Sequence, residues 1–148
     1  MEYLTTHDLV WINQSITGKT NAYHYFNLEA SMAGQYSYGD SQDIPSQAAN
    51  LLGRLIAKAP FEDGNVRTAY IAVLTFLNAN GYATKAEDPL SIEIIRAVAT
   101  GERAPAQAVL ELASPAAQPL AGGISLRTLI SHECNLHSAA LKALAISD

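Results

Sequence analysis

Between two hydrophobic segments the chain reads APFEDGNVRT over residues 59–68. The apolar residues on both sides recur at helical spacing, which predicts one helix from Pro45 to Pro60 and another that ends at Asn80-Gly81. A loop that runs into the start of a helix presents free backbone N–H groups and the positive end of the helix dipole. The stretch therefore has the position of an anion-binding loop between two core helices.

The side chains of this loop suit a phosphate site. Gly64 allows a tight turn and a close approach of the backbone to a ligand, and Asn65 offers an amide donor. Arg67 offers a planar set of donors that matches phosphate oxygens, and Asp63 is a hard oxygen ligand for Mg²⁺. The residues alone favour a simpler alternative, in which Asp63 or Asn65 caps the helix and Arg67 lies on the surface.

Composition limits the class of protein. The 148 residues are 49% hydrophobic and 16% charged, which predicts one folded domain and excludes a disordered chain. A net charge of −5 argues against a nucleic-acid or anionic membrane surface as the main partner. A single cysteine, Cys134, excludes an internal disulfide and fits a reducing compartment. No apolar run reaches membrane-spanning length and the start lacks a basic signal segment, so we expect a cytoplasmic protein.

Helical periodicity extends over most of the chain. Thr5 or Thr6 is expected to cap a first helix, and further helices are predicted over residues 23–32, 88–101, 104–113 and 125–145. Residues 34–44 differ, because aromatic β-formers alternate with turn residues there and predict an extended flap or hairpin. The predicted fold is all-α, with a single short β-hairpin.

The loop resembles the signature of the Fic/Doc family, written His-Pro-Phe-x-Asp/Glu-Gly-Asn-Gly/Lys-Arg-Thr. The matching residues are Pro60, Phe61, Asp63, Gly64, Asn65, Arg67 and Thr68. Similarity to the family extends to residues 28–30 and 47–49, and similarity to the Doc branch extends to residues 75–82 and 99–102. The resemblance predicts a Fic/Doc-like domain over residues 1–113, followed at 114–148 by a linker and a C-terminal helical extension packed on the same domain.

The resemblance implies a compact helical bundle and a group-transfer chemistry. Members of the family transfer AMP, or in Doc a phosphate, from a nucleotide to a protein hydroxyl. It implies ATP or another nucleotide, with Mg²⁺, as cofactors. By similarity Gly64, Asn65, Val66 and Arg67 would bind the nucleotide phosphates, and Asp63 would hold Mg²⁺.

The same resemblance implies that a target protein docks on the flap, by adding a strand to it. The flap residues that would contact the target are Gln35, Tyr36, Ser37 and Tyr38. The two tyrosines fit equally well a role in the core and a role as a surface for a partner.

Two positions depart from the signature. Ala59 stands where the family has the histidine that takes the proton from the target hydroxyl, and general-base catalysis is typically worth about 10²–10⁴ in rate. Val66 replaces Gly or Lys, adds no charge and is stiff enough to crowd a phosphate. Ala59 is either the native residue or an engineered replacement of histidine. Val66 favours native degeneration of the signature, because one engineered change would not explain both departures. His24 is a candidate substitute base, although a surface or capping role is favoured for it.

Two functions therefore follow. The first is a toxin-type, Doc-like nucleotide-dependent transferase whose activity is impaired by the loss of the signature histidine. The alternative is a non-catalytic pseudoenzyme that binds a protein, with or without a nucleotide. No Glu has Ser or Thr four positions before it, as in the inhibitory helix of Fic relatives. Restraint of activity would then come from a separate antitoxin-like chain or from the residues after 113.

His132, Cys134 and His137 resemble a metal cluster only at first sight. Five residues along a helix place His132 and His137 about 140° apart, so they do not share a face. Glu133 and His137 do share one, and a surface pair is the favoured interpretation. Cys134 is expected to be an unreactive core thiol.

Overall fold

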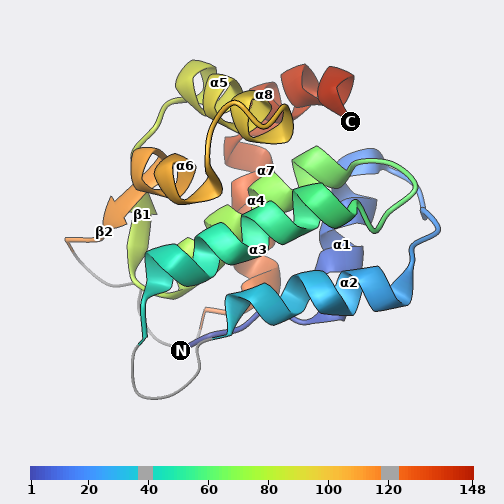
Figure 1. The fold of residues 1–148 in the computed structure, drawn as a ribbon, viewed down its shortest axis with the longest axis horizontal. Coiled ribbons are helices and arrows are strands. Elements are labelled where there is room, and N and C mark those ends of the chain that lie inside the picture. The colour runs from blue at the N-terminus through green and yellow to red at the C-terminus, as the bar shows by residue number, and fades with distance from the viewer. Residues whose placement is uncertain (37–41, 118–123) are drawn as a thin grey trace.

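The computed structural model describes residues 1–36, 42–117 and 124–148. Its elements in chain order are α1 (Thr6–Thr17), α2 (Tyr25–Met32), the 3₁₀ helix η1 (Ala33–Gln35), α3 (Ile44–Lys58), α4 (Asn65–Ala79), β1 (Tyr82–Thr84), α5 (Asp88–Ala99), α6 (Pro105–Leu112), β2 (Ala113–Pro115), α7 (Leu126–Leu136), α8 (Ser138–Leu144) and the 3₁₀ helix η2 (Ala145–Ser147). The predicted all-α class is confirmed (Figure 1).

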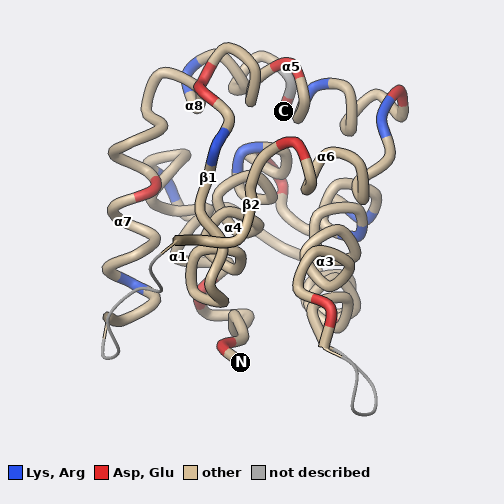
Figure 2. The backbone as a smooth tube through the Cα atoms, turned by 90° about the vertical axis from the view of Figure 1, so that its left-hand side faces the viewer, with Lys and Arg blue, Asp and Glu red and all other residues tan. Residues whose placement is uncertain are grey.

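Helix α4 forms the centre of the bundle. Nearly all of its residues from Val66 to Leu77 are buried, as expected for a helix that is apolar on every side. It packs against α3 on one side and against α7 and α1 on the other, and the side view places α4 between α3 and α7 (Figure 2). The core therefore surrounds α4, and the loop over residues 59–64 lies at its N-terminal end.

Several helix ends follow from local sequence signals. Thr5 caps α1 in a capping box with Asp8, in which each side chain binds the other residue's backbone N–H. Asp43 caps α3, which begins at Ile44, and Pro45 occupies the first turn. Helix α4 ends at Asn80, and Gly81 follows with a φ of 89°.

The small sheet and the last helix differ from the sequence predictions. Strands β1 and β2 pair antiparallel, with Ala83 opposite Ser114, and so join the segment after α4 to the segment after α6. The helix predicted over 125–145 is wrong as a single element, because His137 separates α7 from α8 with a φ of −106° and a ψ of 26°. A hairpin was expected over residues 34–44, but its first residues belong to the 3₁₀ helix η1. Residues 37–41 lie outside the described part of the chain.

Helices α7 and α8 pack on the same bundle as the other helices. Helix α7 contacts α4 and α1, and α8 contacts α5, so these late elements cover the side of α4 that α3 leaves open (Figures 1 and 2). Acidic and basic residues are interspersed along the backbone (Figure 2). Among the described residues no helix has the length and apolar character needed to cross a membrane.

Candidate functional site

The loop between α3 and α4 turns sharply at both of its ends. Ala59 caps α3 in the left-handed region with a φ of 41°, and among the described residues it is the one non-glycine with a positive φ. Gly64 precedes α4 with a φ of 81°. A Cβ at Gly64 would lie 2.6 Å from Cγ2 of Thr17, so the loop backbone approaches α1 as closely as only glycine permits.

Asn65 holds the loop closed on itself. Its Oδ1 accepts a hydrogen bond from the backbone N–H of Phe61 at 2.9 Å, and its Nδ2 donates to the carbonyl of Phe61 at 2.8 Å. Both groups of the amide are therefore used inside the loop. The structure shows Asn65 holding the loop together, and the contact of its second Nδ2 hydrogen with a phosphate stays a prediction.

A buried polar cluster on α1 supports the loop from beneath. Asn13 is 1% exposed, and its Nδ2 donates to the carbonyl of Asp63 at 2.8 Å and to Oγ1 of Thr68 at 3.1 Å. Asn21 donates in turn to Oδ1 of Asn13 at 2.9 Å. Sequence reasoning missed this cluster. The available signal was that Asn13 lies four residues after Leu9, on the apolar face of α1.

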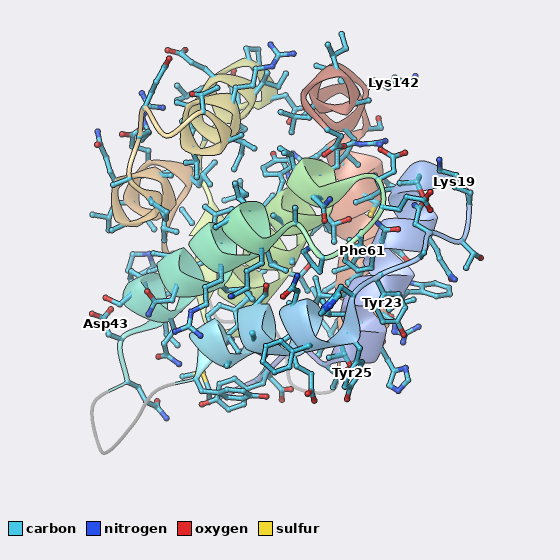
Figure 3. The ribbon with its side chains drawn as sticks, turned by 45° about the vertical axis from the view of Figure 1, so that its right-hand side comes forward. Lys19, Tyr23, Tyr25, Asp43, Phe61 and Lys142 are labelled. Atoms are coloured by element: carbon cyan, nitrogen blue, oxygen red, sulfur yellow. The ribbon has the colours of Figure 1, made fainter. Side chains whose placement is uncertain are left out.

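The segment before α2 pairs with the loop. Tyr23 and Phe61 form an antiparallel bridge with ring centroids 5.8 Å apart, and the two labelled side chains lie next to each other in Figure 3. The backbone N–H of His24 donates to the carbonyl of Pro60 at 2.8 Å. Three chain segments therefore fix the loop, and Phe61 is buried between them.

His24 lies beside the loop, but its ring caps α2. Its Nδ1 accepts a hydrogen bond from the backbone N–H of Asn27 at 3.2 Å. The capping interpretation of His24 is therefore confirmed.

The first turn of α4 binds an anionic side chain. The backbone N–H of Val66 donates to Oδ1 of Asp148 at 2.6 Å, and that of Arg67 donates to the same oxygen at 3.3 Å. Nε of Arg67 pairs with the other carboxylate oxygen. The side chain of Val66 points into the core, since the residue is 8% exposed, so its backbone N–H is open to an anion without a bulky group beside it.

Asp63 faces two cations at the rim of the loop. Its carboxylate lies 3.3 Å from Nζ of Lys19 and 3.9 Å from Nη2 of Arg67, and its side chain is 37% exposed. Magnesium in nucleotide sites is commonly held by one or two carboxylates, with phosphates and water as the remaining ligands. The exposed carboxylate of Asp63 fits that donor set, and in this structure it pairs with Lys19.

The flap residues divide into three groups. Gln35 is fully buried, and its amide exchanges two 2.8 Å hydrogen bonds with the backbone of Leu4, so its side chain is tied to the core instead of facing a target. Tyr36 is 44% exposed and packs edge-on against Tyr3. Ser37 and Tyr38 lie outside the described residues.

A second polar cluster joins α7 to α4 and α5. Glu133 and His137 are 3% and 4% exposed, with Oε2 and Nε2 3.1 Å apart, so the surface pair expected from the sequence is buried. Nδ1 of His137 lies 2.8 Å from a carboxylate oxygen of Asp88. The carboxylate of Glu133 beside the ring raises the pKa of His137 above its usual value and outweighs the opposing effect of burial. Burial also raises the pKa of the Cys134 thiol to about 11, which keeps it unreactive as expected.

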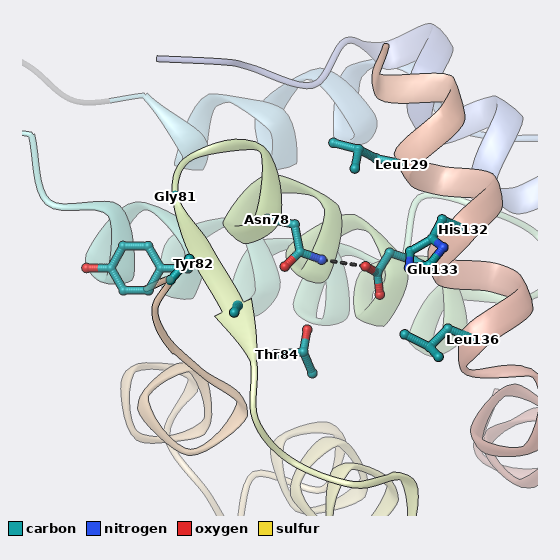
Figure 4. Close-up of a pocket in the computed structure, with 10 residues that line it drawn as sticks. Asn78, Gly81, Tyr82, Thr84, Leu129, His132, Glu133 and Leu136 are labelled. Atoms are coloured by element: carbon teal, nitrogen blue, oxygen red, sulfur yellow. Dashed lines mark hydrogen bonds between the residues drawn. The ribbon is translucent and has the colours of Figure 1, made fainter. Parts of the chain in front are cut away.

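This cluster borders a hollow of about 250 Å³ at the C-terminal end of α4 (Figure 4). Nδ2 of Asn78 donates to Oε1 of Glu133 at 2.5 Å across its floor, and His132 and Leu136 line one wall. Among the described residues no group of three or more His, Cys, Asp or Glu side chains is arranged to hold a metal ion.

Comparison with known protein families matches residues 3–77 to the Fic/DOC family. This stretch is just over half of the 148 residues and extends from the start of the chain into α4, so the chain belongs to the Fic/DOC family. The matched part contains the loop, α1 and the segment before α2, which together build the site. No curated protein and no solved structure matches the chain.

Proposed function

We propose that the loop over residues 59–68 is a Doc-like nucleotide site that binds the phosphates of ATP or a related nucleotide. The observation that carries the proposal is the carboxylate of Asp148, which is held by the backbone N–H groups of Val66 and Arg67 and by the Arg67 side chain. A phosphate oxygen and a carboxylate oxygen require the same donors. The first turn of α4 also places the positive end of the helix dipole at this point.

The reaction proposed for this site is the transfer of AMP or phosphate to a protein hydroxyl. Arg67, whose side chain is 12% exposed, orients the phosphates, and the amides of α4 bind the charge that develops on them. Asp63 holds Mg²⁺, which neutralises phosphate charge when bound. Asn65 contributes indirectly to phosphate binding, because its two hydrogen bonds with the backbone of Phe61 fix the direction of the amides that follow.

Transfer by this chain is proposed to be weak, because position 59 carries no base. Ala59 is exposed and lies at the turn from α3 into the loop. A side chain there starts from a left-handed residue, a conformation in which His is several-fold enriched among non-glycine residues. The backbone therefore suits the histidine that the family signature has at this position, whereas alanine supplies no group that accepts a proton.

A non-catalytic binding function is the second candidate. The aromatic side chains of Tyr23, Tyr25 and Phe26 are 44%, 58% and 72% exposed, and Tyr23 contacts the loop directly (Figure 3). Exposed aromatic residues gathered at one place are typical of surfaces that bind proteins. A target protein or an antitoxin-like chain of a toxin–antitoxin pair would then bind beside the loop in a reducing, cytoplasmic setting.

The test is a labelling reaction in extract of the source cells. The unaltered chain, Ala59→His, and Ala59→His combined with Arg67→Ala are each incubated with ATP labelled at the α- or the γ-phosphate, with Mg²⁺. We expect Ala59→His to raise protein labelling by about 10²–10⁴-fold, because a positioned base contributes that factor. Label retained from the α-phosphate indicates AMP transfer, and label retained only from the γ-phosphate indicates phosphate transfer.

Nucleotide binding separates the two candidates. We expect all variants that keep Arg67 to bind ATP with similar affinity, because the base acts in the transition state. If Ala59→His binds ATP and labels no protein, even with Val66→Gly or Val66→Lys added, the transferase function is wrong and the binding function stands. If no variant binds ATP, the nucleotide site itself is wrong.

A further inference from the structure

Strand β1 pairs with β2 along only one of its two edges. The carbonyl of Gly81 accepts a hydrogen bond from the residue opposite it at 2.9 Å, and the N–H of Lys85 donates to the residue opposite it at 2.8 Å. Hydrogen-bonded and non-hydrogen-bonded pairs alternate along an antiparallel ladder, so Tyr82 and Thr84 belong to non-hydrogen-bonded pairs. Their backbone N–H and C=O groups therefore point away from β2.

This second edge of β1 borders the hollow of about 250 Å³ between β1 and α7 (Figure 4). Tyr82 and Thr84 line the hollow from β1, and Leu129 and Leu136 line it from α7. No residue of the described chain hydrogen-bonds to the backbone N–H or C=O of Tyr82 or Thr84. An unpaired strand edge is a template for another extended backbone, because its donors and acceptors recur at the spacing of a strand.

A buried carboxylate lies at the floor of the same hollow. Glu133 is 3% exposed, and its Oε1 accepts from Nδ2 of Asn78 at 2.5 Å, whereas its Oε2 has no hydrogen-bond partner among the described residues. The described residues that line the hollow include no lysine or arginine. Glu133 and Asp88 lie on two sides of the His137 ring, so two carboxylates share one imidazole. At least one negative charge is left uncompensated beside the hollow, which favours a cationic group there.

We propose that the edge of β1 formed by Tyr82 and Thr84 binds an extended peptide segment of a partner protein, and that this segment carries a lysine or an arginine. The segment pairs with β1 as a third strand, and its basic side chain is directed to Glu133 at the floor. Side chains of a strand alternate between its two faces, so every second residue of the segment can point to the floor. Leu136, which is 58% exposed on the wall formed by α7, offers an apolar contact to the stem of the basic side chain.

The peptide surface is separate from the proposed nucleotide site. The loop over residues 59–64 precedes α4 and β1 follows it, so the 15 residues of this helix lie between the two. At 1.5 Å per residue they span about 22 Å. The inference therefore does not depend on the proposed function, and it holds whether or not the chain binds a nucleotide.

An NMR titration of the ¹⁵N-labelled full chain with the peptide acetyl-Thr-Val-Lys-Val-Thr-amide tests the proposal. The same peptide with norleucine in place of lysine removes the charge and keeps the carbon stem. Thr84→Pro removes one unpaired N–H of β1 and spares the ladder to β2, since the N–H of Thr84 takes no part in that ladder. Thr84→Val is the matched control, because it changes the side chain and keeps the N–H.

We expect the amide signals of Tyr82 and Thr84 to move to lower field as the lysine peptide is added, because each free N–H gains an acceptor. Norleucine should weaken binding about 10-fold, since the charge-assisted hydrogen bond to Glu133 is lost. Thr84→Pro should weaken binding about 10-fold or more, because one pairing N–H is gone and the ring obstructs the edge. Thr84→Val should change the affinity less than about twofold.

Four results would each overturn a stated part of the proposal. Unmoved signals of Tyr82 and Thr84 at about 1 mM peptide would reject the site. Equal affinities for the lysine and norleucine peptides would reject the basic segment, and equal affinities of Thr84→Pro and Thr84→Val would reject pairing with β1. If acetyl-lysine amide binds as tightly as the whole peptide, the hollow takes a small cation and the added strand is wrong. The comparison of the two peptides uses the unaltered chain, so it decides the matter even if Thr84→Pro fails to fold.

Discussion

Replacement of Gly64 by alanine tests how closely the loop is packed on α1. The new Cβ would lie 2.6 Å from Cγ2 of Thr17 and 3.1 Å from Nδ2 of Asn13. Thr17 cannot turn its methyl group away freely, because its Oγ1 donates to the carbonyl of Asn13 at 2.8 Å and accepts from Asn21 at 3.0 Å. The overlap must then be relieved by a shift of the loop backbone.

Gly18 provides a matched control for the strain that a left-handed backbone imposes on alanine. Gly18 also has a positive φ, of 72°, but a Cβ there would meet nothing within 4 Å. Gly18→Ala therefore carries only the left-handed strain, which costs about 1–2 kcal/mol before the smaller gain from a stiffer unfolded chain. Gly64→Ala should lower the free energy of unfolding by about 1–3 kcal/mol more than Gly18→Ala, which is the usual cost of overpacking.

Urea unfolding followed by circular dichroism measures these free energies, and Thr17→Ser identifies their cause. Serine keeps the oxygen of Thr17 and removes Cγ2, the atom that the new Cβ would strike. In the double variant Gly64→Ala with Thr17→Ser, most of the excess cost should disappear. If Gly64→Ala costs no more than Gly18→Ala, or if Thr17→Ser restores nothing, the close packing of the loop on α1 is wrong.

Three further predictions concern the left-handed turn at Ala59, the hydrogen bonds between Asn65 and Phe61, and the buried side chain of His137. Ala59→Gly should stabilise the protein by about 0.5–1 kcal/mol in urea unfolding, because relief of left-handed strain exceeds the added freedom of the unfolded chain; a loss of stability would contradict the left-handed turn. Asn65→Asp should cost about 1–3 kcal/mol, because a carboxylate cannot donate to the carbonyl of Phe61, and unchanged stability would show that this hydrogen bond is weak. The raised pKa of His137 means that its stabilising contribution is complete below the unfolded pKa of about 6.5 and is lost as the pH rises through the folded pKa. Stability measured from pH 6 to pH 9 should fall, and His137→Gln should flatten this dependence.

The helices before the site could be predicted from local signals because those signals determine their ends. Pro45 opens α3, and Asn80 with Gly81 closes α4, through backbone preferences that act over a few residues. The break at His137 could not be found in this way. Its ring is held by Glu133 from its own helix and by Asp88 from α5, so the end of α7 depends on a partner almost 50 residues away.

The site was predictable as a location and less so in its detail. The signature predicts an anion-binding turn at the start of α4, and the structure has the side chain of Asp148 bound to the backbone there. The hydrogen bonds of Asn65 with Phe61 could not be predicted, because an amide that binds its own loop and one that binds a ligand look identical in sequence. The contact with Asp148 was hidden for another reason, since no local pattern relates a residue to a partner 82 positions away.

That separation also sets an order of events during synthesis. Asp148 is added 81 residues after Arg67, and ribosomes extend a chain by about 5–20 residues per second, so the two partners are made about 4–16 s apart. The amides at the start of α4 therefore leave the ribosome before the carboxylate that binds them.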